Sequence, residues 1–202
     1  MNDSIKRSTC RPTRHLSIAV IVLDGFDFGS LGATMEAIST AKRTFGEHAV
    51  SCTTIGMDSS AMSNLGISVT PSITLSNTHL NEYDVTVLIG GSEATLKPNL
   101  ELTQQLINAA EVGRLLGGIW NGAYHLATAG LTDGYECLIA GDGRFSIEPP
   151  ISNGRRYLSW QFDEDRMACS DAVSATFMLN AMFDHFYQTP ATAKHVKTAK
   201  NS

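Results

Sequence analysis

The residues best suited to chemistry surround a sharp junction at residues 117–122. Residues 115–119 form an apolar run that predicts a buried strand, and residues 122–129 predict a short helix. The turn between them must be tight, which Gly122 and Ala123 allow. A residue on such a turn projects into the crevice at the carboxyl ends of the strands, where open α/β sheets place ligands and nucleophiles. We assign the projecting position to Asn121, whose amide does not ionise and is neither a nucleophile nor a base.

Five other residues accompany Asn121 as candidate ligand-binding residues. Gly90 and Gly91 follow the apolar run 85–89 directly, so their N–H groups are predicted to face a bound group, unless they serve only strand-end geometry. Asp24 ends the first strand at the crevice mouth, where it could pair with a cation or simply face solvent. Trp120 and Tyr124 offer aromatic faces to a cationic ligand; Trp120 has packing under the sheet as its alternative role.

Several residues that could take part in binding or catalysis also have a structural interpretation. Asn121 itself could satisfy backbone groups of the turn, as asparagine often does. His125 has no nucleophile placed for it, so we expect it to be structural. Cys137 and Cys169 lie in apolar contexts typical of core thiols, and Trp160 fits a core or a dimer interface equally well. We predict no catalytic residue, no metal site and no cofactor.

The elements that must position these residues alternate along the chain. Apolar runs predict strands at 16–23, 50–57 and 85–89, with a short half-exposed strand at 65–69. Spacings of three and four predict helices over 28–44, which Gly46 would end, from 100 to about 110, and from 173 to 186, the last capped by Ser170 or Asp171. A short strand is expected at 135–139, a site-wall loop at 141–154, and a hairpin from 155–162 to 166–169.

This alternation predicts an α/β fold, a flavodoxin-like three-layer sandwich with a mostly parallel sheet. The 202 residues suit one domain, with 43% hydrophobic and 17% charged residues indicating a globular chain. No apolar run is long enough to span a membrane and no signal-peptide pattern opens the chain, so we expect a cytoplasmic protein. A net charge of −5 without a Lys/Arg cluster argues against direct nucleic-acid binding by this stretch.

The order of elements, Gly90-Gly91, and the stretch Leu126-Ala127-Thr128-Ala129-Gly130-Leu131-Thr132-Asp133-Gly134 resemble the PfpI/ThiJ superfamily, the class I glutamine amidotransferase-like fold. More narrowly, residues 15–188 are similar to the amino-terminal sensor domain of AraC-type transcriptional regulators. Catalytic members carry a cysteine at the junction, a later histidine and an early glutamate. The resemblance places these at Asn121, near Ala140 and near Ser30, so all three catalytic positions are empty and a pseudo-enzyme is implied.

The resemblance therefore implies a non-catalytic, effector-binding and dimerising domain of a transcription regulator. Its small-molecule effector would be an amino acid or a quaternary amine, and it would form a homodimer. DNA would be bound only through a C-terminal helix-turn-helix domain, which these 202 residues lack. We read residues 1–14 as a tail and 189–202 as a linker start or clipped tail, and prefer a truncated regulator to a free-standing relative. The alternatives are a PfpI/ThiJ-type hydrolase, glyoxalase-like lyase or amidotransferase-like enzyme with an unusual site, and a dimerisation domain without a ligand.

Overall fold

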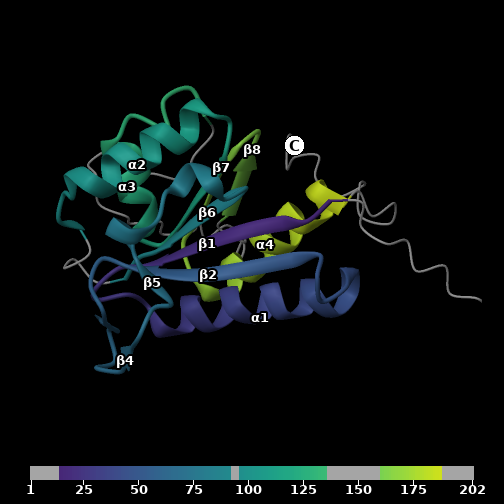
Figure 1. The fold of residues 1–202 in the computed structure, drawn as a ribbon, viewed down its shortest axis with the longest axis horizontal. Helices are drawn as coiled ribbons and strands as arrows, with labels where there is room; N and C mark the ends of the chain where they lie inside the picture. The colour runs from purple at the N-terminus through teal and green to yellow at the C-terminus, as the bar shows by residue number, and fades with distance from the viewer. Residues whose placement is uncertain (1–13, 92–95, 136–159, 188–202) are drawn as a thin grey trace, which may run out of the picture.

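The computed structural model describes residues 14–91, 96–135 and 160–187. Its centre is a seven-stranded sheet in the order β5-β2-β1-β6-β7-β9-β8 (Figure 1). The strands are β1 (Leu16–Val22), β2 (Val50–Gly56), β5 (Ile73–Thr74), β6 (Val85–Ile89), β7 (Leu115–Ile119), β8 (Trp160–Asp163) and β9 (Arg166–Cys169). All neighbouring pairs are parallel except β8 with β9. The predicted mostly parallel sheet is confirmed, and apolar strands suit it because both faces are covered.

Helices cover both faces of the sheet and complete the predicted three layers (Figure 1). Helices α1 (Phe28–Phe45) and α4 (Ala172–Tyr187) pack against the strand residues of one face. Helix α2 (Leu100–Glu111) and the short α3 (Gly122–Thr128) cover the other. Each face therefore has its own apolar core, as the two-sided burial of β1 and β6 requires.

The helix boundaries follow the predicted capping signals. Asp171 is confirmed as the cap of α4, because its Oδ1 accepts the backbone N–H of Ser174 at 2.8 Å. Asp27 caps α1 in the same way through the N–H of Ser30 at 2.7 Å. At the other end of α1, Gly46 has φ 115°, a left-handed value that favours glycine and ends the helix where the sequence predicted.

The chain between β2 and β6 departs from the prediction. The strand expected at 65–69 is reduced to β4 (Ser68–Val69), which pairs with β3 (Ala61–Met62) in a two-stranded hairpin. Residues 64–66 form its turn, where Gly66 has φ 74°, so alternating apolar residues there mark a turn and not a strand. Two short 3₁₀ helices, Leu75–Asn77 and Leu80–Glu82, were not predicted.

Three predictions lie wholly or partly outside the described residues. Tyr135 is in a bend and residues 136–139 are not described, so the strand expected at 135–139 stays a prediction. The proposed wall loop at 141–154 also falls there. The hairpin is confirmed for residues 160–169, and its expected beginning at 155–159 is not described. No helix in the described ranges is long and apolar enough to cross a membrane.

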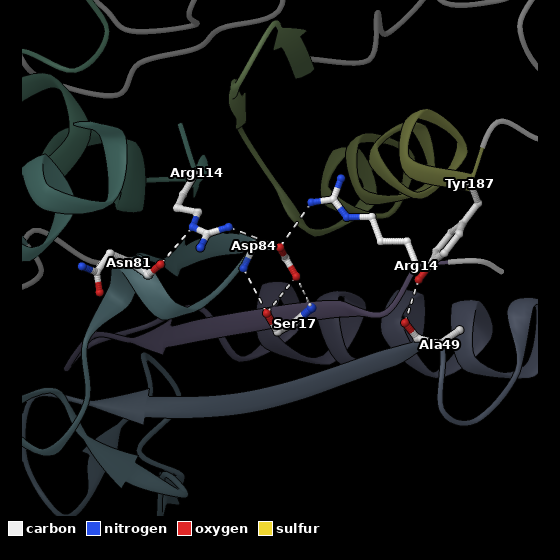
Figure 2. Close-up of polar contacts among 7 residues, drawn as sticks. All are labelled: Arg14, Ser17, Ala49, Asn81, Asp84, Arg114 and Tyr187. Atoms are coloured by element: carbon white, nitrogen blue, oxygen red, sulfur yellow. Dashed lines mark hydrogen bonds and ion pairs between the residues drawn. The ribbon is translucent and has the colours of Figure 1, made fainter. Parts of the chain in front are cut away.

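A polar cluster ties the strands together at the amino edge of the sheet (Figure 2). Asp84 precedes β6, and its Oδ2 accepts both the backbone N–H and the hydroxyl of Ser17 at 2.9 Å. Its Oδ1 lies 3.3 Å from Arg14 and 3.4 Å from Arg114. Nearby, the hydroxyl of Tyr187 donates to the carbonyl of Ala49 at 2.8 Å and holds the end of α4.

We expect this cluster to make the fold sensitive to acid. Burial opposes ionisation of Asp84, but hydrogen bonds from Ser17 and Arg14 outweigh it and hold the pKa of the carboxyl below its ordinary value. Its contribution to stability is therefore present above the unfolded-state pKa of about 4 and is lost as the pH falls through the lower folded-state pKa. Thermal unfolding followed between neutral pH and pH about 3 should show a smaller acid loss in Asp84→Asn than in the wild type. Asp58→Asn, at an exposed turn, should keep the wild-type acid loss; equal slopes in all three proteins would contradict the prediction.

Candidate functional site

The candidate site is assembled from four segments that meet at the carboxyl edge of the sheet. The turn after β1 reaches residue 90, because the N–H of Asp27 donates to the carbonyl of Gly90 at 2.9 Å. The N–H of Gly90 donates to Ile119, the last residue of β7, at 3.1 Å. The N–H of Trp120 donates to the carbonyl of Cys169, at the end of β9, at 2.8 Å. Parallel strands bring these ends together although they are far apart in sequence.

The structure corrects the assignment of the projecting position. Trp120 directly follows β7, and its backbone has φ 51°, in the left-handed region that non-glycine residues seldom adopt. Asn121 has φ −65° and ψ −3° and is already the N-cap of α3. The turn residue that corresponds to a nucleophile position is therefore Trp120, one residue before the predicted Asn121. The sequence spacing is compatible with Trp120 or Asn121 at this position, because only the backbone conformation distinguishes the two residues.

Asn121 instead serves the packing of the turn. It is 7% exposed, and its Nδ2 donates to the carbonyl of Gly91 at 2.6 Å. Its side chain makes no capping hydrogen bond to α3. The amide therefore satisfies a buried backbone acceptor on the neighbouring strand end, which is the local role that the sequence left open beside ligand contact.

The paired glycines permit close contact between backbones. A Cβ atom on Gly90 would collide with the backbone N of Gly122 and lie 2.5 Å from the carbonyl carbon of Asn121. One on Gly91 would collide with the carbonyl oxygen of Gly25 and lie 2.6 Å from the backbone N of Asp27. The N–H of Gly90 is occupied by Ile119, so the prediction that it faces a bound group is wrong. For Gly90 the strand-end explanation is the correct one.

The remaining predicted residues lie at or near this edge. Asp24 is exposed, and its Oδ1 accepts the backbone N–H of Met62 at 2.9 Å, which anchors the β3–β4 hairpin. Tyr124 is half-buried on α3 with its ring 5.5 Å from that of the buried His125, edge to face. Trp160 is half-buried on β8 and packs against the core beneath α4. Trp120 is half-buried at the turn itself.

One more polar side chain lies at this end of the molecule, at a position that the sequence marked only for its missing glutamate. Ser30, in the first turn of α1, is fully buried, and its Oγ has no hydrogen-bond partner among the residues that the structure describes. The resemblance placed the early glutamate of catalytic relatives near this residue. A buried hydroxyl without a hydrogen-bond partner lowers the stability of the fold unless another group pairs with it. We therefore include Ser30 in the candidate site. Burial, which the sequence did not reveal, is the signal that identifies it.

The described thiols are poor nucleophiles. Burial, reinforced by the charge of Asp171, raises the pKa of Cys169 far above its ordinary value, although this residue lies beside the turn. Burial also raises the pKa of Cys52 to about 11, against the opposing charge of Lys42. Both are therefore protonated at neutral pH, as core thiols are. Within residues 14–91, 96–135 and 160–187, no three His, Cys, Asp or Glu side chains gather as metal ligands.

Comparison with known proteins gives relatives in sequence and in fold. No protein-family model matches the chain. The HTH-type transcriptional regulator GbdR of Pseudomonas aeruginosa, from two strains, is 29% identical over 167 residues, which are 81% of this chain and 44% of GbdR. The chain thus spans less than half the length of these curated relatives.

Solved structures agree with this relationship. An AraC family transcriptional regulator from Pseudomonas putida is 28% identical, with a TM-score of 0.71 over 85% of this chain and 92% of the other. A ThiJ/PfpI family protein from Pseudomonas syringae has a TM-score of 0.70 at 17% identity, covering 92% of this chain and 75% of the other. Toxoplasma gondii DJ-1 has a TM-score of 0.65 at 15% identity, covering 85% and 91%. The last two show the fold alone. The chain is a homologue of HTH-type and AraC-family transcriptional regulators, built on the fold of the ThiJ/PfpI and DJ-1 proteins.

Proposed function

We propose that residues 15–188 form the effector-binding and dimerising domain of an AraC-type transcriptional regulator, which senses a small metabolite without transforming it. The observation that carries this proposal is the left-handed turn residue, an indole where catalytic members of the superfamily keep a thiol. Neither Trp120 nor the adjacent Asn121 supplies a nucleophile. The sequence relationship to GbdR and to the AraC family regulator supports the regulatory part.

The strained backbone of Trp120 favours a role in ligand binding over a turn that has no function. A non-glycine residue in the left-handed region costs on the order of 1–3 kcal/mol and persists where the surrounding structure needs it. Here the strain holds a large half-buried aromatic ring at the carboxyl edge of the sheet, beside the segments that carry Gly91, Tyr124 and Asp24. Such a ring suits the cationic group of an amino acid or a quaternary amine, with Asp24 as the complementary charge.

The same elements suggest which groups would fix the rest of the ligand. Within the described part of the chain, the buried Oγ of Ser30 has no hydrogen-bond partner, and a ligand carboxylate or hydroxyl would pair with it. The amide of Asn121 is committed to Gly91 through its nitrogen, which leaves its oxygen to act as an acceptor. Effector binding would then favour one arrangement of the dimer, and DNA would be bound in the cytoplasm by a helix-turn-helix domain elsewhere in the full regulator.

The proposal is tested by calorimetry and thermal-shift measurements with free amino acids and quaternary amines. We expect at least one compound to bind and raise the melting temperature of the wild-type chain. Trp120→Gly should keep the fold, because glycine adopts φ 51° without strain, but should weaken binding roughly tenfold or more. Leu100→Ala, at a remote exposed site on α2, is the matched control and should bind as the wild type does. If no compound binds, or if Trp120→Gly binds normally, the sensor assignment fails.

The enzyme alternative makes a different prediction. An amide hydrolase or a glyoxalase-like lyase needs an ionisable attacking group at the turn, whereas Cys169, the described thiol beside it, is held protonated by burial. We therefore expect no turnover of methylglyoxal or of simple amides. Turnover by the wild-type chain would replace the sensor proposal with this alternative.

A further inference from the structure

The charge of the chain is divided unevenly between its centre and its two end segments. Residues 15–187 contain 8 Lys and Arg against 19 Asp and Glu, so their side chains sum to −11. Residues 1–14 sum to +3, and so do residues 188–202, which contain no Asp or Glu. We call these two end ranges the basic segments. The net charge of −5, which by itself argues against nucleic-acid binding, is therefore the sum of two cationic segments and a strongly acidic centre.

The structure places the starting points of the two basic segments beside each other. Arg14 precedes β1, and its guanidinium carbon lies 5.3 Å from the centre of the ring of Phe186, next to the last residue of α4. Figure 2 shows Arg14 and Tyr187 side by side at the amino edge of the sheet. Segments from opposite ends of the sequence therefore leave the domain from one place, which no local pattern of the sequence records.

Both starting points are fixed by contacts within the domain. The hydroxyl of Tyr187 donates to the carbonyl of Ala49 at 2.8 Å, and its ring stacks on that of Phe45 with the centroids 4.3 Å apart. Arg14 pairs with Asp84 at 3.3 Å and is thus engaged within the fold. The other Lys and Arg residues of the basic segments lie outside the described residues, and they are Lys6, Arg7, Arg11, Lys194, Lys197 and Lys200.

The described surface beside these starting points does not itself attract an anion. Arg43, near the end of α1, is paired with Glu36 at 2.9 Å. Glu47, in the loop that leads to Ala49, is exposed. A polyanion would therefore be attracted by the six cations of the basic segments and repelled by the acidic centre, since unpaired charges act over about 8–10 Å at ordinary salt concentrations. It would be held at the amino edge and kept away from the candidate site, which lies at the carboxyl edge.

Duplex DNA is a polyanion that suits two separate cationic segments. It carries one phosphate charge per about 1.7 Å of its axis, so each cation can meet a phosphate without a shaped pocket. Segments of 14 and 15 residues reach at most about 45–55 Å, and one turn of duplex spans about 34 Å. Both segments can therefore contact the same duplex. The proposed role in transcription regulation makes DNA the relevant polyanion, because a helix-turn-helix domain of the full regulator would hold the chain close to it.

We propose that the two basic segments together bind the phosphate backbone of one DNA duplex at the amino edge of the domain. This inference rests on the regulator part of the proposed function for its choice of partner, and it adds a DNA contact outside the helix-turn-helix domain. Phosphate contacts carry no sequence information, so they strengthen binding to any site and orient the sensing domain on the duplex. Repulsion by the acidic centre turns the carboxyl edge away from the DNA, where a small effector can reach it.

Fluorescence anisotropy of a labelled duplex of about 16 base pairs tests the proposal with the whole chain. We expect binding at about 50 mM salt and a dissociation constant that rises roughly a hundredfold or more by about 200 mM, because each phosphate contact releases counterions. Two triple variants remove the charges of one segment each: Lys6→Gln/Arg7→Gln/Arg11→Gln and Lys194→Gln/Lys197→Gln/Lys200→Gln. Each should weaken binding roughly tenfold or more at the lower salt concentration and reduce the slope of log Kd against log salt by about 2–3.

A pair of single variants provides the matched control. Lys197→Gln and Lys97→Gln make the same chemical change, but Lys97 is exposed before α2 at the carboxyl edge of the sheet. Lys197→Gln should weaken binding several-fold at about 50 mM salt, whereas Lys97→Gln should bind as the wild type does. Thermal unfolding of every variant should match that of the wild type, which verifies that lost binding is not lost folding.

The outcomes separate this inference from the sensor proposal. No binding of the duplex at about 50 mM salt overturns the inference, and so do equal effects of Lys97→Gln and Lys197→Gln. A titration endpoint above one duplex per chain overturns the shared surface, because the two segments would then act on separate duplexes. Tighter binding to vesicles of anionic phospholipid than to the duplex at the same salt concentration overturns DNA as the partner. Effector binding measured by calorimetry decides the sensor part independently of all these results.

Discussion

Gly91→Ala is expected to destabilise the fold by at least about 3 kcal/mol, a large part of the roughly 5–15 kcal/mol by which domains are ordinarily stable. The new Cβ would collide with the carbonyl oxygen of Gly25 and lie 2.6 Å from the backbone N of Asp27. These are backbone atoms of the turn after β1, so they cannot move away as a flexible side chain would. Relief of the collision would pull the turn from the strand end and open the candidate site. Urea unfolding followed by circular dichroism measures the change.

Gly32→Ala is the matched control for this prediction. It makes the same chemical change in a helix, where no atom of residues 14–91, 96–135 or 160–187 outside its immediate surroundings lies within 4 Å of the new Cβ. Alanine is a better helix former than glycine, so we expect a gain of roughly 0.5–1 kcal/mol. Equal effects of the two substitutions would show that the backbone approach at residue 91 is not as close as the structure has it.

Asn121→Asp is expected to cost about 3 kcal/mol or more at neutral pH. In the wild type, the carbonyl of Gly91 accepts a hydrogen bond from Asn121 Nδ2 at 2.6 Å. The substitution replaces this buried donor with a carboxylate oxygen that faces the same carbonyl. Two acceptors repel each other there, and burial at 7% exposure disfavours the charge. The new carboxyl should therefore have a raised pKa, since its protonated form alone can donate to Gly91.

The pH dependence of this variant is opposite to that of Asp84. A folded-state pKa above the unfolded value means that the variant is least impaired below about pH 4 and loses stability relative to the wild type as the pH rises through the folded-state pKa. Urea unfolding of both proteins at several pH values measures this difference. Asn121→Ala, which removes the donor without adding charge, should cost about 1–3 kcal/mol at every pH. Asn108→Asp, at an exposed position on α2, should change little; a similarly small effect at residue 121 would refute the hydrogen bond to Gly91.

Packing explains where sequence reasoning about the fold succeeded and where it stopped. The strands β1, β6 and β7 are buried on both faces, so hydrophobic runs predicted them almost to the residue. The α4 cap at Asp171 and the α1 end at Gly46 were also found, because capping depends on side-chain types within one turn. The hairpin at 61–69 was misjudged, since Gly66 turns the chain at a point where the apolar pattern continues.

The sequence by itself determined most of the sheet, its helices and the sharp turn after β7, because periodicity and glycine content are local properties of the chain. It also determined that no thiol occupies the turn after β7, which holds whether the turn residue is Trp120 or Asn121. Only the tertiary structure decided between those two, because the difference is a single backbone dihedral fixed by the strand ends around it. The local roles of Gly90 and Asn121 were likewise decided by neighbours that are distant in sequence, whose positions no local pattern records.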